Sequence, residues 1–252
     1  MREIMRPYFQ ASIVGAGILA AGIALLPESG GAQSYVAPSE PVLIELFTSQ
    51  GCSSCPPADR LAKRLDQEEG IVVISRPVTY WDYLGWKDSL ASEANTDLQR
   101  AYAQRGLSGY NGVYTPQLVV AGQLGEVGSR EDAIRSKIAR AGAKVDAAIR
   151  VRGSDARGFG IGLAGKTRRQ AELVLVGVDA GAEVAIGRGE NRGRSIAYTN
   201  VLKGERRLAV WEGGEASHAL AKGALNIDGA DRYALVLREV NAGPVLAARW
   251  LN

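Results

Sequence analysis

The sequence predicts an α/β domain over residues 41–143, followed by a mainly β, sandwich-like domain over residues 144–252. Two observations predict this fold class. Between residues 41 and 79, a strand-length apolar run, a C-x-x-C turn, an amphipathic segment and a β-branched run follow one another, which is typical of a parallel βαβ unit. Beyond residue 143, strand-length segments alternate with Gly-rich turns, which indicates packed sheets.

The N-terminal segment, residues 1–32, has the layout of a secretory signal peptide. Arg2 and Arg6 precede an apolar run of 16 residues, 11–26, and small residues follow as far as Ala32. The run is shorter than the ~20 residues that cross a bilayer as a helix. We therefore expect cleavage after Ala32, an N-terminal tail over residues 33–40, and a periplasmic or secreted protein without stable membrane insertion. An uncleaved anchor in the same compartment is the alternative.

The composition argues against several classes of function. Lys and Arg number 30 against 27 Asp and Glu, and so small an excess does not predict a nucleic-acid partner. Beyond the leader the chain has two cysteines, one histidine and no methionine. Zinc and copper sites use several such ligands, so we expect no metal and no cofactor. The single histidine, His218, has no Ser or Cys constellation beside it; we expect it in a surface loop, and a cysteine hydrolase is disfavoured.

Cys52 and Cys55 enclose two serines in a C-x-x-C motif. A bridge between residues so close in the chain closes a very short loop, which removes little entropy from the unfolded state. The pair is therefore predicted to be chemical rather than structural. Export would place it in an oxidising compartment, where thiols are paired, shuttled or repaired.

The segments around the motif predict its geometry. A strand is expected over residues 41–48, and a helix of about 12 to 15 residues is expected to begin at the two prolines after Cys55 and to end near Gly70. The positive end of the helix macrodipole favours a thiolate at the helix start. We therefore expect Cys52 to be ionised, reachable from solvent and the attacking sulfur, and Cys55 to resolve the mixed disulfide.

Further elements complete the first predicted domain. A second strand is expected over residues 71–79, a third over residues 117–121 with a short hairpin partner at 126–128, and a helix over residues 129–141. Residues 80–112 form a predicted helical insertion. The order βαβ, helical insert, ββα is thioredoxin-like.

These motifs resemble known families. A strand, a C-x-x-C at a helix start and a later Thr115-Pro116 before a strand are similar to the thioredoxin superfamily, which implies that Pro116 is cis and faces the disulfide. A more specific resemblance, over nearly the whole chain after the leader, is to exported bacterial proteins known as domain of unknown function 1223. It implies a thioredoxin-like fold and bacterial origin, and no substrate. The stretches that carry it are residues 45–59, 80–88, 113–117 and 187–191.

This chain departs from that family at Pro77 and Thr79, where members often carry His and Asp. The departure removes the basis for an acid-base role in that segment. The resemblance therefore adds no catalytic residue there.

Four aromatic side chains, Tyr80, Trp81, Tyr83 and Trp86, fall within seven residues at the start of the predicted insertion. Trp and Tyr bury much area at modest entropic cost, so Tyr80, Trp81 and Trp86, together with Thr115, are candidates for binding a substrate chain. The alternative is that the aromatic side chains pack the insertion onto the domain.

Glu45 is a candidate proton carrier seven positions before Cys52. It shares one face of the predicted strand with Leu43 and Phe47, so a covered sheet would place its carboxylate in apolar surroundings and raise its pKa. We expect Glu45 to take the proton from Cys55 as that thiol attacks a mixed disulfide. The alternative is a structural ion pair.

The second predicted domain holds a polar, Gly-rich turn at residues 187–194. Its arginines, Arg188, Arg192 and Arg194, could bind an anion or a partner's carboxylate, and a plain hairpin turn is the alternative. The predicted strands of this domain are residues 147–151, 158–163, 171–178, 182–186, 195–202, 207–211, 232–240 and 245–251.

Together these features predict an exported thiol-disulfide oxidoreductase that acts on protein or small-molecule disulfides, with Pro116 holding substrate backbone beside the sulfurs. Its partners would be protein thiols and disulfides or a redox partner protein. The direction of electron flow stays open. The alternative is a thioredoxin-like binding or scaffold protein in which the C-x-x-C remains permanently oxidised.

Overall fold

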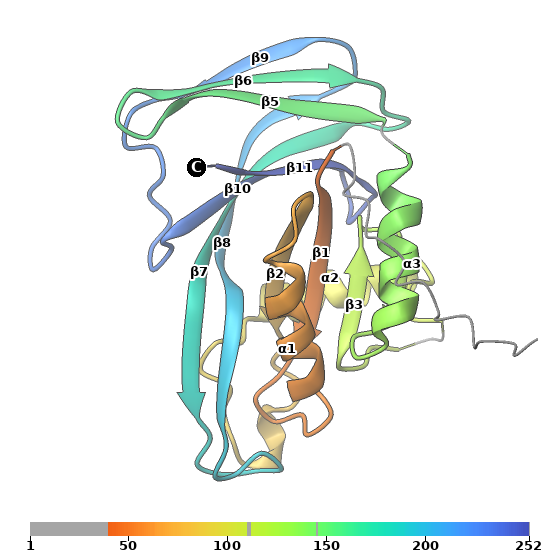
Figure 1. Cartoon of the computed structure of the whole chain (residues 1–252), viewed down its shortest axis with the longest axis vertical. Helices are drawn as coiled ribbons and strands as arrows, with labels where there is room; N and C mark the ends of the chain where they lie inside the picture. The colour runs from red at the N-terminus through yellow and green to blue at the C-terminus, as the bar shows by residue number, and fades with distance from the viewer. Residues whose placement is uncertain (1–39, 110–111, 145, 252) are drawn as a thin grey trace, which may run out of the picture. The chain divides into compact units, whose positions relative to one another are not determined.

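Strands from both halves of the chain join one large sheet (Figure 1). The computed structural model describes residues 40–109, 112–144 and 146–251. In chain order the elements are β1 (Val42–Thr48), α1 (Pro56–Leu65), β2 (Ile71–Pro77), the 3-10 helix η1 (Asp82–Leu84), α2 (Glu93–Gln104), β3 (Gln117–Val120), β4 (Leu124–Val127), α3 (Glu131–Gly142), β5 (Ala147–Ser154), β6 (Gly158–Gly165), β7 (Ala171–Ala185), β8 (Ser195–Trp211), β9 (Ala216–Leu220), β10 (Arg232–Glu239) and β11 (Val245–Leu251).

The large sheet has eight strands in the order β11-β10-β7-β8-β2-β1-β3-β4, and β5, β6 and β9 form a second sheet. β1 pairs in parallel with β2 and antiparallel with β3. The two halves of the large sheet meet where β2 runs parallel to β8, at Ser75 and Val201. The Ser75 hydroxyl also donates to the Thr199 carbonyl at 2.7 Å, which strengthens this short junction.

The predicted fold class is wrong. The structure is mostly β, and the strands after residue 143 continue the sheet of the first half instead of forming a separate β domain behind a helix-flanked thioredoxin-like one. The physical reason lies in β2, whose edge bonds to β8 and whose Val72 and Ile74 pack against Val174 and Val236 of β7 and β10. Hydrophobic periodicity predicts that a strand is buried, but it does not say which strand covers it.

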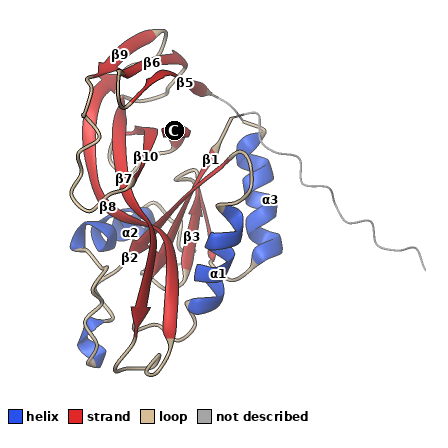
Figure 2. Ribbon diagram, turned by 60° about the vertical axis from the view of Figure 1, so that its left-hand side comes forward, coloured by secondary structure: helices blue, strands red, loops and turns tan. Residues whose placement is uncertain are grey.

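The α-helices cover the β1–β3 part of the sheet on two faces, as Figures 1 and 2 show. Ile44 and Leu46 point toward α1 and α3, where they pack among Leu61, Leu65 and Ile138. The other face of β1 packs against α2, with the rings of Phe47 and Tyr102 in edge contact at 6.0 Å. Side chains therefore alternate across β1 as the sequence predicts, and Glu45 lies on the α2 side.

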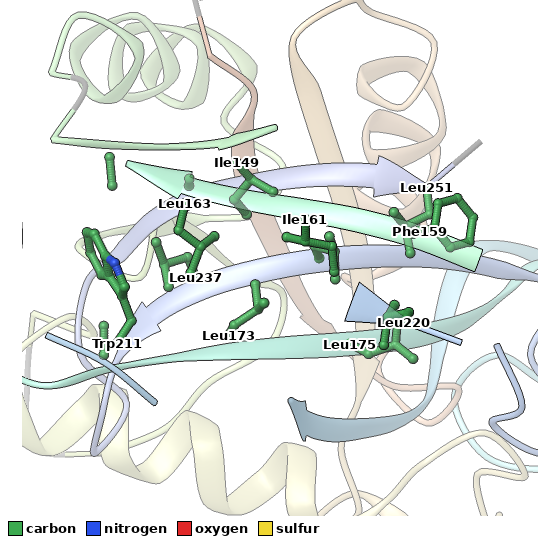
Figure 3. Packing of buried hydrophobic residues seen from close by; sticks show 14 of the residues in the cluster. Ile149, Phe159, Ile161, Leu163, Leu173, Leu175, Trp211, Leu220, Leu237 and Leu251 are labelled. Atoms are coloured by element: carbon green, nitrogen blue, oxygen red, sulfur yellow. The ribbon is translucent and has the colours of Figure 1, made fainter. Parts of the chain in front are cut away.

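The second sheet packs on the far part of the large one. Figure 3 shows Ile149, Ile161 and Leu163 of this sheet together with Leu173 and Leu237 of the large sheet. These residues belong to one apolar core that is buried between the two layers. Face-to-face packing of sheets is thus present, as the Gly-punctuated pattern indicates, but within a single folded body.

Several local predictions need correction. The segments predicted as separate strands at 171–178 and 182–186 are one long strand, β7, and those at 195–202 and 207–211 are one strand, β8. Both strands continue through register shifts, which break the alternation that marks a strand in sequence. His218 lies in β9 opposite Ile161, half-buried, and not in a surface loop.

Two predictions concern the chain ends and the membrane. The predicted leader, and all of the predicted tail except Glu40, lie outside the described residues. Within the described ranges, no helix is long and apolar enough to cross a membrane.

Candidate functional site

The two cysteines lie in the loop between β1 and α1, which we call the CSSC loop (residues 49–55). Cys52 and Cys55 are joined by a disulfide. Cys55 occupies the N-cap of α1, and its carbonyl accepts the backbone amides of Ala58 and Asp59. Two prolines fill the first helical turn, where their missing amide hydrogens cost no helical bond. The predicted strand, turn and helix start are therefore all present.

Both cysteine side chains are fully buried, while Ser53 and Ser54 between them are exposed. The expectation that Cys52 is reachable from solvent is therefore wrong for this oxidised form. The Cys52 sulfur lies 3.3 Å from the Ser54 hydroxyl, and no local sequence pattern reveals that both cysteines are buried.

Thr115 and Pro116 lie beside the start of α1, and their peptide bond is cis, as the resemblance implied. A Cβ placed on Gly128 would lie 3.0 Å from Pro116 Cβ and 3.1 Å from Ala58 Cβ, so the proline and the first turn of α1 approach the same point. Thr115 Oγ1 accepts a hydrogen bond from the Trp81 indole at 2.8 Å.

The aromatic segment packs around the CSSC loop with unequal exposure. Trp81 lies directly against Gly51, where an added Cβ would come within 3.1 Å of the Trp81 Cβ. The Trp86 indole donates to Gln50 Oε1 at 2.8 Å, and the Tyr80 hydroxyl donates to the Gln99 side chain. Tyr83, in contrast, is 81% exposed. Trp81 and Trp86 thus hold the loop, and only Tyr83 stands free in solvent.

The polar turn between β7 and β8 reaches the same loop. Asn191 is fully buried, and its Nδ2 donates to the carbonyls of Gln50 and Cys52, each at 2.9 Å. Glu190 Oε2 accepts the backbone amide of Ser53 at 3.1 Å. Sequence reasoning missed these two roles, although both residues fall in the last stretch that carries the family resemblance.

The three arginines of this turn, predicted to bind an anion, have exposed side chains. Arg194 donates to Asn191 Oδ1 at 3.0 Å, so it supports the buried amide. Arg188 and Arg192 project from the same turn into solvent. Anion binding there stays a prediction.

Glu45 is held by two partners on the α2 side of the sheet, opposite the face that α1 covers. Its Oε1 accepts from Arg76 Nε at 2.7 Å, and its Oε2 accepts from the Tyr102 hydroxyl at 2.6 Å. Burial and the neighbouring Glu45 carboxylate raise the pKa of Tyr102 well above its usual value. These contacts are those of a structural ion pair, the alternative that the sequence left open.

The buried acid on the same side of the sheet as the cysteines is Asp59, which sequence reasoning missed. It is 2% exposed and one turn after Cys55 on α1. Thr48 Oγ1 donates to its Oδ1 at 2.8 Å, and its Oδ2 is buried with no hydrogen-bond partner among the described residues. Burial raises the pKa of Asp59 to about 7, although Thr48 opposes the shift. The sequence signal that could have identified Asp59 is its position four residues after Cys55, because residues with this spacing lie on one face of a helix.

Two further groups complete the polar interior of the site. Asp88, 3% exposed, accepts the Gln50 amide on Oδ2 at 2.8 Å, and burial raises its pKa. The buried Tyr198 hydroxyl has no partner in the described chain; burial, Asp59 and Asp88 all raise its pKa. Within the described ranges no group of three or more His, Cys, Asp or Glu is placed to hold a metal.

Fold and site define a mostly β protein with a buried disulfide between β1 and α1, in a loop whose backbone is bonded to the turn of the β7–β8 hairpin. The chain belongs to the family described as Protein of unknown function (DUF1223), whose model matches residues 43–238. The resemblance that the sequence suggested is therefore confirmed.

Two solved structures are similar. A crystal structure from Agrobacterium tumefaciens, 29% identical, aligns over 83% of this chain and 93% of its own, with a TM-score of 0.70. HBP35 of Porphyromonas gingivalis, 15% identical, aligns over 85% of this chain and 75% of its own with a TM-score of 0.51, which shows a similar fold alone. No curated protein matches the sequence.

Proposed function

We propose that this protein is an exported thiol-disulfide oxidoreductase that exchanges the Cys52–Cys55 disulfide with protein or small-molecule thiols. One observation carries the proposal: a disulfide between residues three apart caps α1, and a buried carboxyl with an unpartnered oxygen follows one turn later. A short disulfide contributes little to stability, so its retention at a helix start favours chemistry.

In the oxidising direction, a substrate thiolate attacks Cys52 Sγ. A new bond forms between the substrate sulfur and Cys52, and the Cys52–Cys55 bond breaks with its electron pair on Cys55. A second substrate thiolate then attacks the substrate sulfur and releases Cys52 as a thiolate. Two substrate thiols have become one disulfide, and the protein has gained two electrons. The two protons that the substrate thiols lost go to solvent, from which the Cys52 and Cys55 thiolates can take them up. The N-terminus of α1 stabilises the thiolates in this sequence.

In the reducing direction the same steps run backward, and Asp59 acts on Cys55. The Cys55 thiol gives its proton to the Asp59 carboxylate as its sulfur attacks Cys52 in the mixed disulfide. A carboxyl with a pKa of about 7 accepts and returns a proton at neutral pH, which an ordinary exposed aspartate does poorly. Residues i and i+4 of a helix share a face, which suits this transfer.

The compartment and partners follow from the sequence. The leader over residues 1–32 supports export to an oxidising compartment, where a C-x-x-C disulfide is stable. Proteins with exposed thiols or labile disulfides, or a dedicated redox partner, are the expected reactants. Tyr83, at 81% exposure beside the site, is the aromatic side chain available to contact them.

The rival function is a binding or scaffold protein whose disulfide stays oxidised. A specific observation favours it, because both cysteine side chains are fully buried. In this account the disulfide only shapes the loop beneath the hairpin.

Turnover of a defined substrate separates the two functions. Wild-type protein should accelerate the reduction of insulin disulfides by dithiothreitol, or the oxidation of reduced glutathione. Cys52→Ser should abolish both, and Cys55→Ser should accumulate a mixed disulfide with glutathione at Cys52, seen as a mass increase. If wild-type protein accelerates neither reaction and Cys55→Ser gains no mass, the oxidoreductase proposal is wrong.

Equilibration with glutathione buffers measures the reduction potential and hence the direction. A value near ~−120 mV indicates an oxidant, and a value near ~−270 mV indicates a reductant.

A further inference from the structure

The turn that joins β7 and β8 lies at the same end of the molecule as the start of α1, as Figure 1 shows. We call residues 187–194 the hairpin turn. Its residues are exposed except Asn191, which points inward and is fully buried. The contacts of this turn with the CSSC loop join residues 137 to 141 positions apart in the chain.

Every donor of the Asn191 side-chain amide, and its oxygen, is hydrogen-bonded. The two Nδ2 hydrogens go to the carbonyls of Gln50 and Cys52, and Oδ1 accepts from Arg194. Glu190 adds a bond from the outside, where its carboxylate accepts the Ser53 amide. The backbone on both sides of Cys52 is therefore held by side chains of the hairpin turn.

Trp86 forms the second anchor of the turn. A Cβ on Gly187 would lie 3.0 Å from the Trp86 ring, and one on Gly189 would lie 3.5 Å from the Trp86 Cβ, so the indole packs directly on the glycine backbone. The same indole donates to Gln50 in the CSSC loop. Hairpin turn, Trp86 and loop are thus linked pairwise.

This arrangement limits the chemistry of the disulfide. An incoming thiolate must reach a sulfur, so the rate of exchange depends on access to Cys52 as well as on its reactivity. Cys52 is 0% exposed, its Sγ lies 3.3 Å from Ser54 Oγ, and side chains of the hairpin turn hold the backbone around it. Exchange therefore requires these contacts to open.

We propose that Asn191 is a positioning residue that fastens the hairpin turn to the backbone of the CSSC loop and thereby limits how readily thiols reach the disulfide. The inference rests on the proposed function, because access matters only where thiols react. Asn191 touches the backbone of Cys52 and not the reacting sulfur, so its effect is on access. Two ordinary hydrogen bonds correspond to roughly a tenfold to hundredfold change in the opening equilibrium.

The test measures reduction of the protein's own disulfide by dithiothreitol near neutral pH, in the folded full chain. Asn191→Ala and the isosteric Asn191→Asp, which keeps the volume but loses both donated bonds, should be reduced at least tenfold faster than wild type. Asp228→Asn, an exposed substitution outside the hairpin turn, should match wild type. Hydrogen exchange should show the Ser53 amide losing protection in both Asn191 variants, while Ile44 in β1 keeps its protection.

The possible outcomes distinguish local opening of the CSSC loop from a general loss of folded structure. If both Asn191 variants are reduced at the wild-type rate, or if Ile44 loses protection together with Ser53, the proposal is overturned. Because dithiothreitol acts on the protein alone, this result does not depend on turnover. Suppose that the variants are reduced faster but that wild-type protein shows no activity on insulin or glutathione. The oxidoreductase proposal would then be rejected, and the role of Asn191 in limiting access to the disulfide would stand.

Discussion

Glu45 and Asp59 are buried carboxylates on the two elements that flank the CSSC loop, and they differ in their hydrogen-bond partners. The partners decide whether each carboxylate can exchange a proton. Glu45 has a guanidinium and a phenol on its two oxygens, so its charge is balanced where it lies. Asp59 has one hydroxyl and one oxygen without a partner. A buried carboxylate that lacks a partner favours the protonated form, which makes Asp59 the better proton acceptor at neutral pH.

Asp59→Asn should change the pH dependence of stability in a defined direction. Folding raises the pKa of Asp59 from 3.8 to about 7, so its stabilising contribution is complete below about pH 4 and is lost as the pH rises through 7. Asparagine keeps the Thr48 bond without the charge. The variant's free energy of unfolding should therefore exceed that of wild type increasingly from about pH 4 to pH 8, by at most roughly 4 kcal/mol. Urea unfolding at several pH values measures this.

The same variant tests the proton transfer. Insulin reduction near pH 7 should slow by roughly 100-fold, because general acid-base catalysis typically contributes that much. Asp228→Asn, an exposed substitution, is the control for both measurements. A stability difference that is equal at about pH 4 and pH 8 would contradict a charged, buried Asp59.

At the scale of elements, the β7–β8 hairpin and the segment around η1 form one side of the site. Their contact depends on a glycine backbone, since Gly187 lies directly under the Trp86 ring. Gly181 in β7 serves as the control glycine, because no atom lies within 4 Å of a Cβ added there. The pair allows a test in which only one substitution disturbs the contact.

Gly187→Ala should displace Trp86, and Gly181→Ala should not. In two-dimensional NMR the Trp86 indole N–H signal, whose proton is donated to Gln50, should shift in the first variant alone. Reduction of the disulfide by dithiothreitol should also become faster in that variant. An unchanged indole signal in Gly187→Ala would show that the hairpin does not rest on Trp86 in solution.

At the scale of the whole molecule, a chain of ion pairs that begins at the buried Glu45 and Arg76 crosses the junction between the two halves. Glu45 pairs with Arg76, which also binds Glu205 of β8 at 2.5 Å, and Glu205 in turn binds Arg238 of β10 at 2.8 Å. Burial opposes ionisation of Glu205, but Arg76 and Arg238 lower its pKa to about 2. The buried Arg76 is destabilising where a partner carboxylate is missing, and one of its two partners, Glu205, comes from the second half, so the first half is incomplete alone.

The fragment of residues 40–143 should therefore not fold by itself. Separation exposes Leu43, Val72 and Ile74, which pack against the later strands, and leaves Arg76 without Glu205. Circular dichroism should show no cooperative thermal transition for the fragment and a single transition for the full chain. A cooperative transition in the fragment would restore the two-domain description.

Local sequence predicted β1, α1 and the disulfide loop because each depends on neighbours in the chain. The alternation of Leu43, Glu45 and Phe47 with Ile44 and Leu46 correctly predicts which side chains of β1 share a face, and the structure covers both faces. Burial of Cys52 could not be predicted, since its surroundings include residues distant in the chain, such as Asn191, which donates to the Cys52 carbonyl from 139 positions later. The role of Asp59 could be guessed from its spacing, but its unpartnered oxygen depends on how the surrounding elements close over it.

The amino-acid pattern alone determined a cysteine pair at the start of a helix, a preceding strand of alternating faces and the family to which the chain belongs. The strand and the helix start follow from short-range periodicity and turn chemistry, whereas the family was indicated by the resemblance of sequence motifs. Tertiary structure decided that β2 bonds to β8 and that a hairpin from the second half holds the backbone of the CSSC loop. Backbone hydrogen bonds between strands are nearly blind to side-chain identity, so the choice of partner strand depends on the burial achieved by the whole chain.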